Sequence, residues 1–177
     1  MNHRSLLILL ALCLVLLASL SRLLPHPPNF TPLGAIALFA GVFLWQRWWL
    51  LVVPLAALYL SDVLMGYIWH DMMPFVYAAF ALIVVLGLAI RHRPRPLPVF
   101  ACALTGSIGF FVITNLGVWL RGTLYPMTWE GLMACYVAAI PFFRHQLAGD
   151  LLYTALLFGV YWACCYAPWR RLKPATA

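Results

Sequence analysis

Polar side chains that can bind or react are rare in this chain, and most of them stand near the ends of apolar segments. The candidates are Asn29, Asp62, Trp69, His70, Asn115, Tyr125 and Asp150. Carboxylates and amides exchange hydrogen bonds with polar groups, imidazole donates or accepts, and aromatic rings stack on flat molecules. Residues of these types are suited to holding a small molecule by hydrogen bonds and stacking.

Signatures of common reaction chemistry do not accompany these residues. The sequence contains no GxSxG, HExxH or Walker-type phosphate loop. Its five cysteines form no CxxC pair, so the spacing supports neither a zinc site nor a disulfide framework. We therefore predict a protein that is not an enzyme and holds no metal or cofactor.

The composition indicates where the chain resides. Of its 177 residues, 66% are hydrophobic and 8% charged, with a mean hydropathy of +0.96, whereas a soluble domain carries about 25% charged residues. This excludes a soluble enzyme and predicts an integral membrane protein with the lipid bilayer as a partner. The net charge of +7 comes without a nucleic-acid-binding motif, so no nucleic acid is expected.

Six segments are apolar enough to be candidate membrane-spanning helices, each of which needs about 20 residues. They are residues 5–24, 33–45, 48–66, 75–90, 98–120 and 146–167. A further apolar stretch, 131–143, is too short to span the membrane comfortably and is predicted to be a short outer helix or re-entrant segment. Pro126 precedes it, and Gly131 and Pro141 lie within it. The expected fold is all-α, a single transmembrane domain over 1–177 with halves 1–90 and 98–177 joined by the basic, proline-rich loop 91–97.

The basic residues predict an orientation in the membrane. With both termini cytoplasmic, eight of the eleven Lys and Arg residues face the cytoplasm, as the positive-inside rule requires. We therefore expect a multi-pass protein of the bacterial cytoplasmic (inner) membrane. The N-terminal segment favours a retained helix, although Arg4, the apolar run 6–18 and Ser19 and Ser21 also suit a signal peptide.

The deepest polar residues are predicted to share one level near the outer side. At 1.5 Å per helical residue, Asp62 lies roughly 6 Å below the outer end of its helix. Asn115 is about as deep, and Asp150 lies one turn into the last predicted helix. Together with Asn29 they predict an outward-facing cavity with a polar floor, and its expected rim is Trp69, Tyr125 and Trp129.

Each of these residues also has a simpler interpretation. Asp150 suits a helix cap, and Asn115 suits a bond to a neighbouring helix. Asp62 suits a structural ion pair with Arg22, Arg121 or Arg144. The outer tryptophans and tyrosines suit a membrane-interface belt.

Several short strings carry a resemblance. They are LPHPPNFTPLGA at 24–35, Ser61-Asp62, NLGVW at 115–119, IPFF at 140–143 and Gly149-Asp150-Leu151. Over about residues 20–162 they resemble a family of small bacterial membrane proteins of unassigned function. That family is similar to the substrate-binding S-components of energy-coupling-factor (ECF) vitamin transporters. The resemblance implies six helices, a vitamin bound from outside by outer loops and helix ends, and a coupling subunit with ATPases as partners.

Two departures from that class stand out. Its cobalamin-transporting members use a cysteine near the outer start of the fourth helix, where this chain has Phe75, Val76 and Tyr77. The usual Ala-xxx-Ala docking motif is missing from the first segment, where Ala11 and Ala18 are seven apart. The first departure argues against cobalamin, although Cys135 or an outer histidine is left as an alternative cobalt ligand.

The leading functional prediction is uptake of a small vitamin or cofactor-like molecule. Asp62, Asn115 and Asp150 are expected to form the cavity floor. Asn29 and His70 are expected to contact the substrate from the loops, with Trp69 and Tyr125 stacking on it. Two alternatives stay open: a haem or metal membrane protein using His26, His70 and His145, and a structural or assembly subunit without a ligand.

Overall fold

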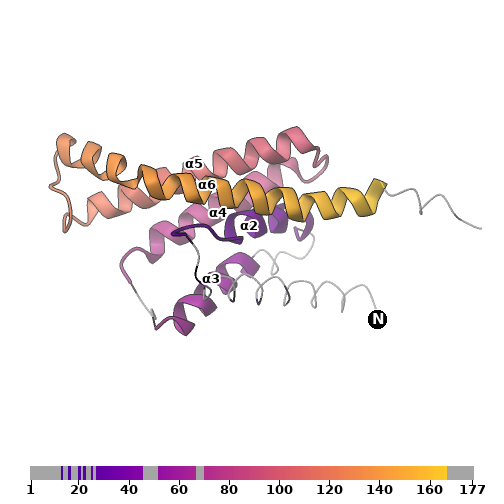
Figure 1. Ribbon diagram of the computed structural model, residues 1–177, viewed down its shortest axis with the longest axis horizontal. Helices are drawn as coiled ribbons and strands as arrows, with labels where there is room; N and C mark the ends of the chain where they lie inside the picture. The colour runs from indigo at the N-terminus through magenta and orange to yellow at the C-terminus, as the bar shows by residue number, and fades with distance from the viewer. Residues whose placement is uncertain are drawn as a thin grey trace, which may run out of the picture.

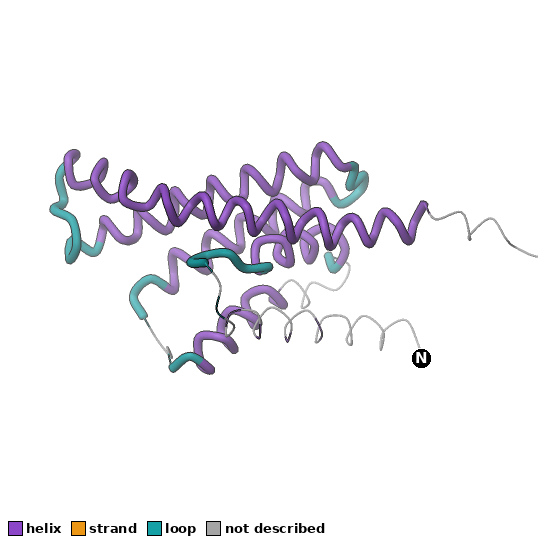
Figure 2. Tube along the Cα trace, in the orientation of Figure 1, coloured by secondary structure: helices purple, strands orange, loops and turns teal. Residues whose placement is uncertain are grey.

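Within the part of the chain that the structure describes, all regular structure is helical (Figure 1, Figure 2). The computed structural model describes residues 27–45, 52–66 and 70–166, together with Cys13, Leu16, Leu20, Arg22 and Pro25. The helices are α2 (Leu33–Phe43), α3 (Val53–Leu64), α4 (Met73–Ile90), α5 (Pro96–Leu120) and α6 (Trp129–Tyr166). The predicted all-α class is confirmed. Six membrane-spanning helices are not shown, and most of the predicted first segment, 5–24, lies outside the described residues.

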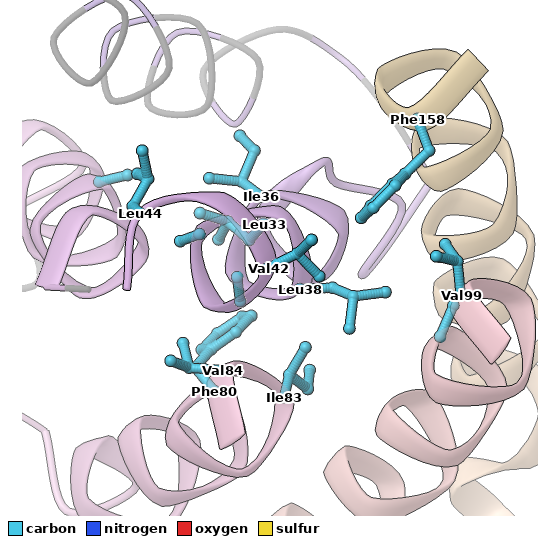
Figure 3. Close-up of a cluster of buried hydrophobic side chains, with 14 of the residues drawn as sticks. Leu33, Ile36, Leu38, Val42, Leu44, Phe80, Ile83, Val84, Val99 and Phe158 are labelled. Carbon is cyan, nitrogen blue, oxygen red and sulfur yellow. The ribbon is translucent and has the colours of Figure 1, made fainter. Parts of the chain in front are cut away.

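Helix α2 is the centre of the fold. Nine of its 11 residues are buried, and the helix packs against α3, α4, α5 and α6. An apolar helix without a polar face has to be surrounded on all sides. Its Leu38 and Val42 pack in the core with Phe80 and Val84 of α4 and Phe158 of α6 (Figure 3).

Two glycines allow α2 and α4 to approach closely. A β-carbon at Gly41 would lie 2.2 Å from the carbonyl oxygen of Val84, and one at Gly87 would lie 2.4 Å from the carbonyl oxygen of Leu38. Small residues let helix backbones come this close in an apolar environment. Helix α2 supplies one half of this contact through Gly41, and α4 supplies the other half through Gly87.

Helices α4 and α5 have the length and apolarity needed to cross a bilayer, and among the described helices only these two do. From Leu104 to Leu120, every fourth residue of helix α5 is apolar and exposed. Residues four apart are neighbours on a helix surface, so they form a continuous stripe. This stripe is made of Leu104, Ile108, Val112, Leu116 and Leu120. A continuous apolar stripe on a long helix is typical of contact with lipid or with another apolar surface.

Helix α6 corrects the prediction of a separate outer segment at 131–143. That stretch and most of the predicted last span belong to one helix of 38 residues, with Pro141 inside it. Contacts with α5 hold both sides of the proline: Tyr136 Oη donates to the Val112 carbonyl over 2.8 Å, and the rings of Phe143 and Phe111 are 4.9 Å apart. A proline costs a helix one amide donor, and packing against neighbouring helices makes this tolerable in apolar surroundings.

The two ends of the bundle differ in their polar residues. Residues 91–95 connect α4 to α5 at one end of the bundle (Figure 2). At this end Trp162 Nε1 donates to the Pro94 carbonyl over 3.0 Å. At the opposite end, Arg121 Nη2 lies 2.8 Å from Asp71 Oδ2. Because α5 begins at Pro96, the connector is shorter than the predicted 91–97. Helices of the two predicted halves pack against each other, as α2 does against α6 and α4 against α5.

Candidate functional site

A partly open cavity of about 310 Å³ is lined by residues from six separate parts of the chain. Its polar lining consists of Arg22, Asn29, Thr31, Asp62, His70, Gln146 and Asp150. The remaining lining is apolar apart from Gly34, and consists of Pro28, Leu33, Leu58, Met65, Val76, Phe80, Ile83 and Phe110. An apolar enclosure with a few convergent polar groups and a volume near 300 Å³ is typical of a small-molecule site.

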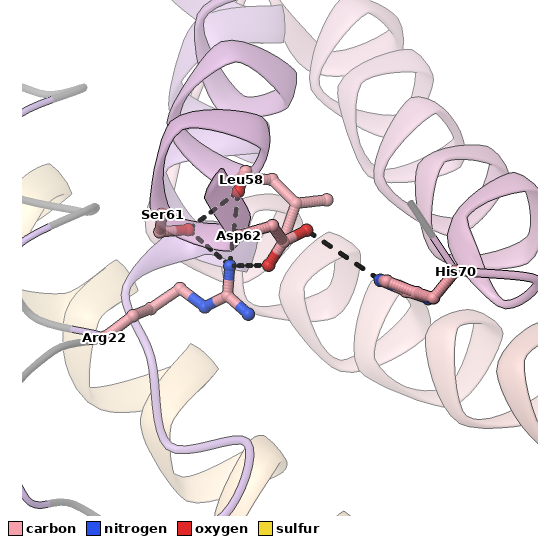
Figure 4. Close-up of polar contacts among 5 residues, drawn as sticks. All are labelled: Arg22, Leu58, Ser61, Asp62 and His70. Carbon is pink, nitrogen blue, oxygen red and sulfur yellow. Dashed lines mark hydrogen bonds and ion pairs between the residues drawn. The ribbon is translucent and has the colours of Figure 1, made fainter. Parts of the chain in front are cut away.

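One side of the cavity carries an ion pair between Arg22 and Asp62 (Figure 4). Arg22 Nη1 lies 2.7 Å from Asp62 Oδ1 and also donates to the hydroxyl of Ser61 and to the Leu58 carbonyl. Ser61 in turn donates to the same carbonyl over 2.7 Å. The Asp62 side chain is only 5% exposed, so this guanidinium compensates a carboxylate that would otherwise be buried without a counter-charge.

His70 approaches the other oxygen of the same carboxylate. Its Nε2 lies 4.0 Å from Asp62 Oδ2, and its side chain is 38% exposed (Figure 4). This separation exceeds hydrogen-bond distance. His70 also lines the cavity, so its imidazole can contact a molecule that occupies the space beside Asp62.

The opposite side of the cavity is built around Asp150 of α6. Its Oδ2 accepts from Ser107 Oγ over 2.7 Å and from Gln146 Nε2 over 3.5 Å. Its Oδ1 faces the start of α2, where a β-carbon at Gly34 would lie 2.1 Å from it. Asp150 is 6% exposed, so its carboxylate is held by neutral donors in a largely apolar environment.

The loop before α2 forms a wall of the cavity through Pro28, Asn29 and Thr31. Asn29 has a φ of 63°, a left-handed conformation that asparagine adopts more readily than most residues. The loop also packs on α6, because a β-carbon at Gly149 would lie 3.3 Å from the amide nitrogen of Thr31. The tight turn thus holds the wall against the helix that carries Asp150.

Four of the seven predicted site residues line this cavity together: Asn29, Asp62, His70 and Asp150. They come from distant parts of the sequence. Trp69 lies outside the described residues.

Asn115 and Tyr125, predicted at the same site, lie elsewhere. Asn115 is eight residues beyond Ser107 on α5, about 12 Å along the helix, and its amide donates to the Phe111 carbonyl of its own helix. Tyr125 belongs to the loop before Trp129, the start of α6. Asp150 follows Trp129 by 21 residues, about 32 Å along a helix, so the expected rim of Tyr125 and Trp129 is far from the floor.

Besides Thr31, three polar residues of the site were not among the predicted binding residues. Arg22 was considered only as an ion-pair partner of Asp62, and it also lines the cavity. Gln146 precedes Asp150 by one helical turn, a spacing that places two side chains on the same helix face. Ser107 gave no signal of its own in the sequence, because a serine in an apolar helix most often bonds its own backbone.

The histidines do not gather in the described part of the chain. Within it, no group of three or more His, Cys, Asp and Glu side chains is placed to hold a metal ion. His145 is exposed on α6, and His26 lies outside the described residues.

Comparison with known proteins gives a family but no characterised relative. No curated protein and no solved structure matches the chain. One family model matches residues 2–172, which is nearly the whole sequence. The chain therefore belongs to the family described as "Family of unknown function (DUF6580)".

Proposed function

We propose that this protein is a membrane-embedded, substrate-binding component, similar to an ECF S-component, that takes up a small vitamin or cofactor-like molecule. The observation that carries the proposal is the cavity between Arg22–Asp62 and Asp150. Burying charged and hydrogen-bonding groups is costly in apolar surroundings, so such groups most often mark a site of function. A ligand-free structural subunit is expected instead to fill this space with side chains.

The surface of the helices supports a place in the membrane. The stripe from Leu104 to Leu120 on α5 is apolar and exposed, and so are Val137, Leu156 and Val160 on α6. In water such a surface would drive aggregation, whereas in a bilayer it is solvated by lipid chains. Together with the length of α4 and α5, it favours a protein that spans the membrane. The inner membrane and the cytoplasmic termini belong to the same proposal and rest on the distribution of the Lys and Arg residues.

Transport through this site requires the cavity to open to the outside for binding and then to the cytoplasm for release of the substrate. Pro28, Asn29 and Thr31 of the loop before α2 form one wall of the cavity. Opening of this loop, together with tilting of the protein by a coupling subunit and its ATPases, would complete the uptake cycle.

The test is co-purification of the substrate. The full chain is extracted in a mild non-ionic detergent and examined by native mass spectrometry, in parallel with the Asp62→Ala/Asp150→Ala double variant. Asp71→Ala is the matched control, because Asp71 is an exposed carboxylate that is not among the residues lining the cavity. The wild type and the control are expected to retain a small molecule that the double variant loses.

Two results would contradict the proposal. One is a wild-type protein that retains no small molecule even when it is extracted directly from cells. The other is a compound retained equally by the wild type and by the folded double variant. An optical spectrum and metal analysis of the same samples address the haem or metal alternative.

A further inference from the structure

The two carboxylates of the cavity differ in how their charge is compensated. Asp62 pairs with Arg22 at 2.7 Å, whereas Asp150 is held by Ser107 and Gln146, which are both neutral. The ion pairs among the described residues join Arg22 or His70 to Asp62 and Arg121 to Asp71, so none of them includes Asp150. The described lining holds one arginine and two carboxylates, and with a neutral histidine it is therefore negative.

The position of Asp150 makes this imbalance costly. Its partner Ser107 is fully buried and lies 13 residues from the end of α5, about 20 Å along the helix. A carboxylate this deep, 6% exposed and without a cation, is unfavourable until a positive charge or a proton reaches it. The cavity is the route by which such a charge would arrive, since Asp150 is part of its lining.

The wall beside Asp150 indicates what else the ligand carries. Phe80 and Phe110 line the cavity with their rings 5.2 Å apart in an edge-to-face arrangement, and Ile83 lies on the same side. Aromatic and aliphatic walls favour an apolar or aromatic body, and the faces of aromatic rings also attract cations.

We propose that the substrate is a small organic cation, in which a protonated amine pairs with Asp150 while an apolar or aromatic body packs on Phe80 and Phe110. This inference rests on the proposed function and narrows its substrate class. The Ser107 hydroxyl and the Gln146 amide hold Oδ2, which leaves Oδ1, beside Gly34, for the ammonium group. The same ammonium chemistry is carried by soluble amines and by aminophospholipid headgroups.

The first experiment varies only the charge of a probe. Binding of tryptamine, tryptophol and indole-3-acetate to the purified full chain in dodecyl maltoside is measured by isothermal titration calorimetry. Benzylamine with benzyl alcohol gives a second pair with a smaller body. We expect each amine to bind roughly tenfold tighter or more than its alcohol, as a charge-assisted bond implies, and the carboxylate to bind least.

Variants locate the preference. Asp150→Asn keeps the shape of the side chain and is expected to remove the difference between amine and alcohol. Asp71→Asn removes an equivalent charge from the exposed pair with Arg121 and is expected to leave the difference intact. If Asp150→Asn does not fold, the charge series on the wild type still decides, because it needs no variant.

The results that would overturn the inference are distinct from those that would overturn uptake itself. Three results would each rule out an ammonium site: equal binding of amine and alcohol, tighter binding of the carboxylate, and no binding of either amine. Equal binding is the result expected if Asp150 carries a proton. Native mass spectrometry gives an independent answer. A retained compound that is neutral or anionic contradicts the cation while leaving uptake in place, and retained phosphatidylethanolamine supports the ammonium site but contradicts uptake of a soluble molecule.

Discussion

The carboxylate of Asp150, in the middle of α6, lies directly against the backbone of Gly34 in the first turn of α2. The space that a β-carbon would occupy at Gly34 is taken by the carboxylate, with Oδ1 at 2.1 Å and Oδ2 at 3.2 Å from that point. No other residue type leaves room for Asp150 in this position. The floor of the cavity is thus formed by a helix start and a helix middle that are more than 100 residues apart in sequence.

The first prediction concerns this contact. Gly34→Ala is expected to push the Asp150 carboxylate away from its place and to lower the affinity for the retained molecule by about tenfold, or about 1.4 kcal/mol. The matched control is Gly159→Ala, also within a helix, where a β-carbon would meet no atom within 4 Å. Titration calorimetry on both variants checks this, and unchanged affinity in Gly34→Ala would contradict the floor as described.

The second prediction concerns the contact between α2 and α4. Gly87→Ala places a methyl group 2.4 Å from the Leu38 carbonyl, where the neighbouring backbone has to move. Overpacking of this kind costs about 1–3 kcal/mol. Thermal unfolding in detergent is expected to show a clear loss for Gly87→Ala. The Gly159→Ala control is expected to be unchanged or slightly stabilised, since alanine favours helix over glycine.

The third prediction concerns the ion pair between Arg22 and Asp62. Arg22→Met leaves Asp62, 5% exposed, without its cation, and Asp62→Asn leaves the guanidinium without its carboxylate. The losses of unfolding free energy in the two single variants are expected to add up to more than the loss in the double variant. A double-mutant cycle by unfolding in detergent is expected to give a coupling energy of about 0.5–3 kcal/mol. Strict additivity of the two changes would show that the pair contributes no interaction energy.

The fourth prediction concerns the exposed ion pair between Arg121 and Asp71. Asp71 is 68% exposed and Arg121 is 38% exposed, at an Nη2–Oδ2 distance of 2.8 Å. Solvent and salt screen such a pair, so Asp71→Asn is expected to change the unfolding free energy by less than about 1 kcal/mol. The same unfolding measurement at low and high salt checks this. A loss as large as that of Asp62→Asn would contradict this prediction, because the Arg121–Asp71 pair would then contribute as much to stability as a buried ion pair.

The fifth prediction concerns orientation in the membrane. Arg93 and Thr123 are exposed and lie in the connectors at opposite ends of α5. In a cysteine-free background, Arg93→Cys is expected to react with a membrane-impermeant maleimide only after the cells are opened, and Thr123→Cys to react on intact spheroplasts. The reverse pattern would invert the proposed topology, and reaction of both on intact spheroplasts would contradict a membrane-spanning α5.

The sequence by itself determined the helical class and the kind of residue at the site. A continuous apolar run long enough to cross a bilayer satisfies its own backbone hydrogen bonds as a helix. The bounds of α4 and α5 were therefore predicted to within two residues. Asp62 and Asp150 stood out because burying a carboxylate in an apolar helix costs free energy, and such residues most often mark functional sites.

Only the tertiary structure decided which polar residues meet. Pro141 suggested a break, but contacts of Tyr136 and Phe143 with α5 keep α6 continuous, which moves Asp150 far from Tyr125 and opposite Ser107. Helical periodicity gives the face on which a side chain stands, whereas the level at which two helices touch depends on all the packing between them. That level brought Gly34, Ser107 and Asp150 together and left Asn115 outside the cavity.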